Sequence, residues 1–238
     1  MSLKFYYGVI KSGKTRDLMN IYSNYTFKGM TPMAVSLTLD DKNLGILREY
    51  NDLSGESIVI NFVTHIDDKF FDSFLNQKVD ILLVDNVHLI DYKGAAILRQ
   101  IANAGIPVVT FGLRTKYDGS IYVGAVEMLR IADRIEEVID ICWCGRRAIM
   151  SAAYDLVNYT VVRNIEDITK VGFVGVCHRH WTEGKLFRGT VENYNNFDVF
   201  VDCKNRGYRE EVLIAEFGDV LYKVFSERYK ERIVKGRV

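Results

Sequence analysis

A short glycine-containing segment near the N-terminus carries the clearest chemical signal in the chain. Residues 8–15 read Gly-Val-Ile-Lys-Ser-Gly-Lys-Thr directly after an apolar run, which matches the phosphate-binding loop (P-loop) pattern. Glycines let backbone N–H groups turn toward phosphate oxygens, and the following helix adds partial positive charge. Lys14 is expected to reach the β- and γ-phosphates of ATP, and the Thr15 hydroxyl to hold Mg²⁺. The expected nucleotide-binding residues of this loop are Gly8, Lys11, Ser12, Gly13, Lys14 and Thr15.

An aspartate at the end of a second apolar run is the expected partner of the P-loop. The run reads Ile81-Leu82-Leu83-Val84-Asp85, and a carboxylate at a strand end can orient the ligands around Mg²⁺. An aspartate that follows a strand can also cap the next helix. We predict the magnesium role for Asp85.

Four metal-ligand residues form a Cys-x-Cys…Cys-x-x-His pattern in the second half of the chain. They are Cys142, Cys144, Cys177 and His180. Thiolates and imidazole at such spacing suit a closed tetrahedral Zn²⁺ site, which has a structural role. His178 is a competing ligand, and the alternative is three buried thiols beside a surface histidine.

Five short apolar runs alternate with polar, helix-like stretches through the first 140 residues. The runs are nearly continuous, as in strands that are covered on both faces. Strands separated by helices predict an α/β fold, a mostly parallel sheet flanked by helices as in P-loop NTPases. The expected strands are Leu3–Val9, Met33–Leu39, Ser57–Val63, Asp80–Asp85 and Ile106–Gly112, and the expected helices are Lys14–Lys28, Asp67–Asn76 and Lys93–Ala104.

The pattern becomes irregular after about residue 140, which predicts three parts. We expect a nucleotide-binding α/β domain over residues 1–139, a small metal-binding subdomain over 140–182 and an extension over 183–238.

Within the extension, two elements are expected. Leu186–Tyr194 and Phe197–Cys203 flank Asn195-Asn196 and predict a β-hairpin, because asparagine tolerates the positive φ of tight turns. Glu211–Lys235 is typical of an amphipathic helix, which either packs on its own core or forms a surface for a partner.

Composition is that of an ordinary globular protein. The 238 residues are 48% hydrophobic and 26% charged, and 31 basic residues balance 31 acidic ones. Zero net charge gives no argument for binding nucleic acid or a membrane surface. No run approaches the roughly 20 apolar residues of a membrane-spanning helix, and the N-terminal residues have no signal-peptide pattern. We therefore expect a cytoplasmic protein.

Several further motifs occur in order around these features and carry a family resemblance. Together they resemble the thymidine kinases of the tetrameric, zinc-containing type over residues 3–182, most closely the bacterial members. The motifs are Phe5-Tyr6-Tyr7-Gly8-x-x-x-Ser12-Gly13-Lys14-Thr15, Val84-Asp85, Gly112-Leu113-Arg114-Thr115, Ala132-Asp133-x-Ile135-Glu136-Glu137, Ile141-Cys142-x-Cys144-Gly145-Arg146-x-Ala148 and Cys177-x-Arg179-His180-Trp181.

The resemblance implies transfer of the γ-phosphate of ATP to the 5′-hydroxyl of thymidine with Mg²⁺, a structural Zn²⁺, and a homo-oligomer, either tetramer or dimer. The family's catalytic base, a glutamate directly after the aspartate, is replaced here by Asn86. An amide cannot accept the hydroxyl proton, and losing a general base typically costs about 10²–10⁴ in rate. His88 either substitutes as base or only forms a local hydrogen bond.

The resemblance also implies a nucleoside pocket. Leu113, Tyr117 and Tyr122 stand where the family has a leucine and two aromatic residues, so they form either a base-stacking wall or ordinary core. In the loop before the third zinc ligand the family's Gly-Gly pair is absent, and Phe173 replaces a tyrosine. The family's Asp-x-Arg pair becomes Asp40-Asp41-Lys42, without a guanidinium fork. A site that loses hydrogen bonds to its substrate loses selectivity, so the nucleoside accepted stays open.

Three functional hypotheses follow from the sequence. The first is a working deoxynucleoside kinase with a replaced base. The second is a catalytically silent relative that binds nucleotide and acts through protein interactions of its extension. The third is a P-loop phosphotransferase or hydrolase that acts on another nucleotide.

Overall fold

The computed structural model describes residues 2–39, 47–51, 57–156, 160–165, 168–187, 196–205, 207, 209–217, 222–223, 225–227 and 229–230. Contacts divide the chain into two compact units, Met1–Leu186 and Phe187–Val238.

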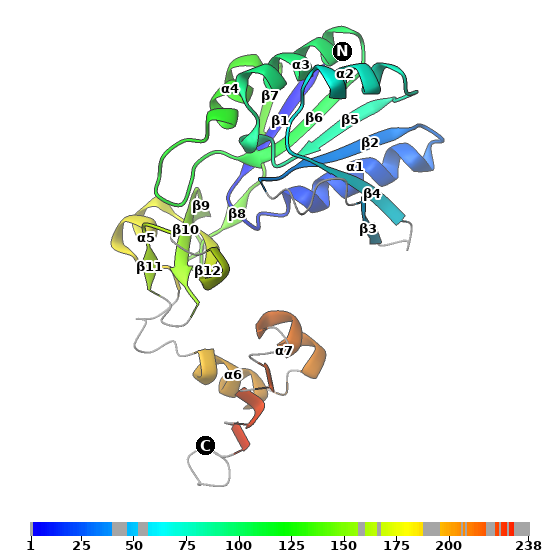
Figure 1. The fold of residues 1–238 in the computed structure, drawn as a ribbon. Coiled ribbons are helices and arrows are strands. Elements are labelled where there is room, and N and C mark those ends of the chain that lie inside the picture. Colours follow the sequence, from blue (N-terminus) through cyan, green and yellow to red (C-terminus); the bar gives the residue numbers. More distant parts are fainter. Residues whose placement is uncertain are drawn as a thin grey trace. The chain divides into compact units, whose positions relative to one another are not determined.

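A seven-stranded sheet forms the centre of the first unit, with the strand order β3-β4-β2-β5-β6-β1-β7 (Figure 1). Neighbouring strands are parallel, except that β3 pairs antiparallel with β4 at one edge. The central strand β5 is buried at every residue, as its continuous apolar sequence predicts. The strands are β1 (Leu3–Gly8), β2 (Pro32–Leu37), β3 (Leu47–Asn51), β4 (Ser57–Val63), β5 (Ile81–Asp85), β6 (Val108–Leu113) and β7 (Arg134–Glu137).

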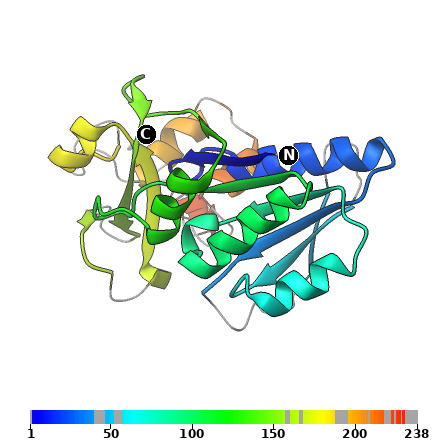
Figure 2. The ribbon, with the colours of Figure 1, turned by 90° about the horizontal axis from the view of Figure 1, so that it is seen from above.

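Helices cover both faces of this sheet (Figure 1; Figure 2). Helix α1 (Lys14–Phe27) lies on one face, where its Leu18 packs in a buried cluster with side chains of β2, β4, β5 and β6. Helices α2 (Asp68–Leu75), α3 (Tyr92–Asn103) and α4 (Val123–Ile131) contribute to the larger cluster on the other face. The sheet is therefore buried between two helical layers, which leaves its carboxyl edge for a site.

Side-chain caps fix where two of these helices begin. The Asp67 carboxylate accepts a hydrogen bond from the Phe70 N–H at the start of α2, and Asp91 does the same for the Gly94 N–H at the start of α3. Such caps satisfy N–H groups that the helix itself leaves unpaired.

The predicted strands and helices of the first 140 residues are confirmed, each within two residues at either end. Pro107 lies just before β6, where its missing N–H costs no sheet hydrogen bond. Among the described residues of this part, strands β3 and β7, helix α4 and the 3₁₀ turn η2 (Val87–Leu89) were not predicted.

A second, smaller sheet follows β7 in the first unit. Its order is β11-β10-β12 and both pairs are antiparallel, and we call it the lasso sheet. A β8-β9 hairpin precedes it and helix α5 follows it. The elements are β8 (Asp140–Ile141), β9 (Arg147–Ala148), β10 (Met150–Asp155), β11 (Val161–Val162), the 3₁₀ turn η3 (Ile168–Lys170), β12 (Val171–Val176) and α5 (His178–Glu183).

The second unit is helical in its described residues, which corrects the predicted hairpin. The expected strand Phe197–Cys203 lies inside helix α6 (Asn196–Asn205), and most of the other expected strand lies outside the described residues. Phe200 and Val201 are buried together because a helix brings their apolar side chains onto one cluster. The predicted long helix begins as α7 (Glu210–Phe217), and described residues within 222–230 are helical too.

Candidate functional site

The P-loop lies between β1 and α1, and two of its positions, Gly8 and Gly13, require glycine. Gly13 has φ +93° and Lys11 has φ +62°, so the chain twice adopts the left-handed region. A Cβ on Gly8 would lie 2.5 Å from the Ser12 Oγ and 2.8 Å from the Val138 carbonyl oxygen. No side chain fits at Gly8 without moving the loop.

The Lys14 ammonium is buried inside the loop. Its Nζ lies 2.5 Å from the Val9 carbonyl oxygen and 3.2 Å from the Ser12 Oγ, and both atoms accept hydrogen bonds from it. Burial lowers the pKa of Lys14 to about 8, against the opposing attraction of the Asp85 and Asp140 carboxylates. These contacts hold the cation where an incoming phosphate could exchange with its present acceptors.

The Thr15 hydroxyl and the Asp85 carboxylate meet beside Lys14. Thr15 Oγ1 donates to Asp85 Oδ2 at 2.8 Å, and the Asn86 N–H donates to Asp85 Oδ1 at 2.8 Å. Burial raises the pKa of Asp85, while these two hydrogen bonds and Lys14 oppose that shift. Two hard oxygen donors at hydrogen-bond distance suit Mg²⁺, which favours carboxylate and hydroxyl ligands next to nucleotide phosphates.

A cavity of about 360 Å³ opens at the carboxyl edge of the sheet and brings most of the predicted residues together. Parallel strands end at one edge, so residues after β1, β5 and β6 meet there. The described residues that line it are Ile10, Lys11, Ser12, Gly13, Lys14, Thr15, Arg16, Asp85, Asn86, His88 and Leu113.

Asn86 lies in this cavity wall in a left-handed conformation with φ +54°. Its side-chain Nδ2 donates to the Ser36 Oγ at 3.2 Å and to the Leu37 carbonyl oxygen at 3.3 Å. Asparagine tolerates this backbone region better than most residues. The amide thus links the turn after β5 to the end of β2, and it has no carboxylate oxygen to offer a substrate hydroxyl.

His88 lies in the 3₁₀ turn η2 (Val87–Leu89) and is buried. The Leu113 N–H donates to its Nδ1 at 3.3 Å, and its ring packs edge-on against Tyr122 at 4.5 Å between centroids. A neutral imidazole whose Nδ1 accepts a hydrogen bond carries its proton on Nε2. Burial, with a smaller effect of Lys14, lowers the pKa of His88 to about 4. Of the two alternatives that the sequence left open for His88, this arrangement favours the local hydrogen bond over a role as substitute base.

The predicted nucleoside residues do not all reach the cavity. Leu113 lines it, and Tyr122 contacts the lining residue His88. Tyr117 and Phe173 pack edge-on against each other at 6.4 Å, and neither is among the lining residues. The segment with the altered Asp-x-Arg pair lies outside the described residues.

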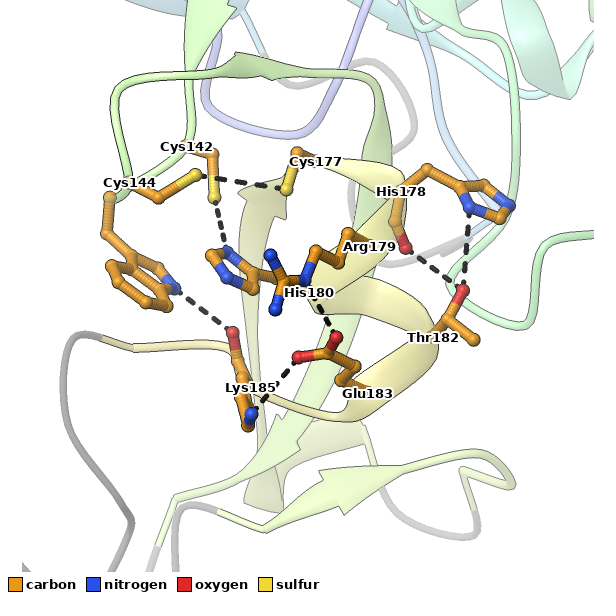
Figure 3. A network of polar contacts seen from close by, with 10 residues as sticks. Cys142, Cys144, Cys177, His178, Arg179, His180, Thr182, Glu183 and Lys185 are labelled. Carbon is orange, nitrogen blue, oxygen red and sulfur yellow. Dashed lines mark hydrogen bonds and ion pairs between the residues drawn. The ribbon is translucent and has the colours of Figure 1, made fainter.

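The four predicted metal ligands converge at the end of the lasso sheet (Figure 3). Their ligand atoms all lie within 4.8 Å of one another. The Cys142 Sγ is 3.3 Å from the His180 Nδ1, and the Cys144 Sγ is 3.9 Å from the Cys177 Sγ. A tetrahedral zinc ion with Zn–S of about 2.3 Å needs sulfur atoms about 3.8 Å apart. The donor set and its spacing therefore fit Zn²⁺, whereas His178 turns away toward Thr182.

Each of the chain's two tryptophans is next to a metal ligand in the sequence, and sequence reasoning gave neither a role. Trp143 stacks on the His180 ring at 4.1 Å between centroids, and its Nε1 donates to the Lys185 carbonyl oxygen. Trp181 Nε1 donates to the Tyr117 carbonyl oxygen at 3.0 Å. The position of Trp143 between two cysteines was the available signal, since a residue there must lie beside the metal site.

No helix among the described residues has the length and apolar character needed to cross a membrane.

Comparison with known proteins gives consistent family matches. The chain matches the thymidine kinase family model over residues 1–181. It is 30% identical to a thymidine kinase of Agrobacterium fabrum over 187 residues, which cover 76% of this chain and 96% of the relative. A thymidine kinase of Francisella tularensis is 28% identical over 198 residues, with coverage of 76% and 97%, and that of phage T4 is 27% identical over 194 residues, with coverage of 76% and 96%.

Among solved structures, an isolated ATPase domain aligns at 12% identity with a TM-score of 0.44, over 76% of this chain and 82% of that chain. The fold assignment rests on the sheet, the P-loop and the metal-ligand cluster instead. From the match over residues 1–181, the chain belongs to the thymidine kinase family.

Proposed function

We propose that this protein binds ATP with Mg²⁺ at its P-loop and slowly transfers the γ-phosphate to the 5′-hydroxyl of a deoxynucleoside. The observation that carries the proposal is the arrangement of Lys14, Thr15 and Asp85, whose polar atoms meet in one cavity. Family membership supports the same reaction class.

Each residue of this group has a distinct task in the proposed reaction. Lys14 exchanges its hydrogen bonds to Val9 and Ser12 for hydrogen bonds to phosphate oxygens. The negative charge of the phosphates stabilises the lysine ammonium, whose positive charge is disfavoured by burial. Backbone N–H groups at the start of α1 add further donors. Thr15 and Asp85 hold the Mg²⁺ shell, and the metal neutralises charge on the phosphates.

The weak point of the proposed site is proton removal from the nucleoside hydroxyl. Among the described residues that line the cavity, Asp85 is the single carboxylate, and both its oxygens accept hydrogen bonds. Loss of a general base costs about 10²–10⁴ in rate. Phosphoryl transfer depends mainly on positioning and electrostatics, so a reduced rate is expected rather than none.

The proposal names a deoxynucleoside rather than thymidine because a hydrogen-bonding group of the family's pocket is replaced here. Phe173 has no hydroxyl and packs against Tyr117, so it offers an apolar surface to a base but no hydrogen bond. A pocket that reads a base by shape alone discriminates poorly between nucleosides. We therefore expect relaxed selectivity among pyrimidine deoxynucleosides.

The direct test combines Mg-ATP, a panel of deoxynucleosides and the variant Asn86→Glu. The variant restores a carboxylate, and its turnover is expected to exceed that of the wild type about tenfold or more. Asn86→Gln is the matched control, because it has the same length, the same φ requirement and no carboxylate. Equal rates for both variants would contradict the missing-base argument.

The second candidate function is a catalytically silent nucleotide-binding protein. The engaged amide of Asn86 and the accepting Nδ1 of His88 favour it, since neither side chain is free to take a proton. It predicts a rise in melting temperature with nucleotide but no product, even with Asn86→Glu. Activity on another acceptor but on no deoxynucleoside would instead favour a different phosphotransferase.

A further inference from the structure

One backbone N–H of the P-loop is bound by a residue that lies far away in the sequence. The Ile10 N–H donates to the Ser151 Oγ at 3.1 Å, across 141 residues. Ser151 lies in strand β10 and is buried, with 3% of its surface exposed. A buried hydroxyl in this position fixes the direction of the peptide that starts the phosphate-wrapping turn.

The cross-strand partner of Ser151 makes a second contact with the same loop. Gly175 of β12 pairs with Ser151 in the lasso sheet. A Cβ on Gly175 would lie 2.6 Å from the Val9 Cγ2 and 3.0 Å from the Asp140 Oδ2. Glycine is therefore needed for the loop to pack this closely on the strand. The adjacent residues Val9 and Ile10 thus rest on one cross-strand pair.

Val9 connects this contact to the phosphate-binding cation. Its carbonyl oxygen accepts a hydrogen bond from Lys14 Nζ at 2.5 Å, while its side chain packs on Gly175. A shift of Val9 would therefore move the acceptor that places Lys14. The lasso sheet sets the position of the lysine through one residue.

One of these two strands, β12, leads directly into the metal-ligand cluster. Strand β12 finishes at Val176, directly before Cys177, and the Ile149 N–H donates to the Val176 carbonyl oxygen at 3.0 Å beside the start of β10. Gly175 is two residues from a metal ligand. An ion that clamps the end of β12 thus restrains the strand that supports the P-loop.

We infer that the Ser151–Gly175 pair positions the P-loop, and that metal binding and nucleotide binding are therefore coupled. The inference rests on the proposed nucleotide binding. Coupling of two sites is reciprocal, so nucleotide must strengthen metal binding by the factor by which metal strengthens nucleotide binding. The lasso sheet then supports the phosphate site as well as the metal ligand Cys177.

The first test measures ADP affinity by titration calorimetry on the metal-loaded, full-length protein. Ser151→Ala is expected to weaken ADP binding about tenfold, because the Ile10 N–H loses its buried acceptor. Ser151→Thr keeps the hydroxyl and is expected to restore most of the affinity. Ser73→Ala, an exposed serine of α2, is the matched control and should bind as the wild type does.

The second test measures the equilibrium affinity for Zn²⁺ by competition with a chelator, with and without ADP. In the wild type, ADP is expected to strengthen Zn²⁺ binding about fivefold or more, and in Ser151→Ala by less than about twofold. Unchanged ADP affinity in Ser151→Ala, or a wild-type Zn²⁺ affinity that ADP does not raise, would overturn the coupling.

The outcomes also separate this inference from the proposed function. A wild type that binds no nucleotide refutes both. If the wild type binds ADP and Ser151→Ala binds it equally well, the inference is refuted but the proposed function is not. If Ser151→Ala melts before it can be titrated, Ser151→Thr decides, because loss of affinity with the hydroxyl and the fold retained would contradict the positioning role.

Discussion

The His88 imidazole gives the sharpest prediction for solution experiments. It accepts a hydrogen bond from the Leu113 N–H, packs against Tyr122, and is only 8% exposed. Burial lowers its pKa to about 4, so the folded protein holds it neutral. Substitution by asparagine keeps an acceptor near the Nδ1 position but removes the titrating group.

The magnitude follows from proton linkage. An unfolded histidine has a pKa of about 6.5, so between that value and about pH 4 the unfolded chain binds one more proton. The contribution of His88 to stability is therefore complete above pH 6.5 and falls as the pH decreases. Between pH 6.5 and pH 5.0 the contribution of His88 to the free energy of unfolding falls by about 1.36 kcal/mol per pH unit, which over 1.5 units is about 2 kcal/mol.

The assay is urea unfolding of wild type and His88→Asn at pH 7.5, 6.0 and 5.0, followed by tryptophan fluorescence. Both tryptophans, Trp143 and Trp181, lie in the first unit, so the signal reports that unit. All residues other than position 88 are the same in both proteins, so their contributions cancel in the difference. The stability advantage of the wild type is expected to shrink by about 2 kcal/mol between pH 7.5 and pH 5.0.

Parallel stability curves for the two proteins would refute this reasoning. They would mean that burial does not hold the imidazole neutral in the folded protein. His88 would then return as a candidate base in place of the missing glutamate.

Three further outcomes are expected. Lys14→Ala should abolish the nucleotide-induced rise in melting temperature, because the phosphates lose their buried cation; a retained rise would place the nucleotide elsewhere. Gly8→Ala should lower the stability by about 1–3 kcal/mol in urea unfolding, since a Cβ there meets Ser12 at 2.5 Å. Removal of metal by a chelator should lower the melting temperature and change tryptophan fluorescence, because Trp143 stacks on the ligand His180; no change in either signal would contradict a structural zinc site.

Local sequence pattern was sufficient for the α/β core. Continuous apolar runs such as Ile81–Asp85 favour strands that are covered on both faces, and the longer polar stretches between them favour crossover helices. The weakest predictions concern elements without such a signal. Strand β7, Arg134–Glu137, is polar and short, and it forms because β1 offers it a free parallel edge.

The predicted hairpin failed for a related reason. A short apolar run such as Phe197–Cys203 suits a strand or one face of a helix, and periodicity alone does not separate the two. The Asn195-Asn196 turn signal misled, because asparagine also begins helices, and Asn196 is the first residue of α6. The helix is favoured because it buries Phe200 against Leu213 and Phe225. This packing joins segments that are separated in the sequence.

From residue types and their spacing, the sequence predicted the phosphate loop, an aspartate as its partner and the metal-ligand set, and the structure brings these groups together. The replaced base was predicted from the family resemblance. Only the tertiary structure decided which nitrogen of His88 is blocked and that Ser151 and Gly175 support the P-loop. Those facts arise from packing between segments far apart in the chain, and local spacing carries no information about such contacts.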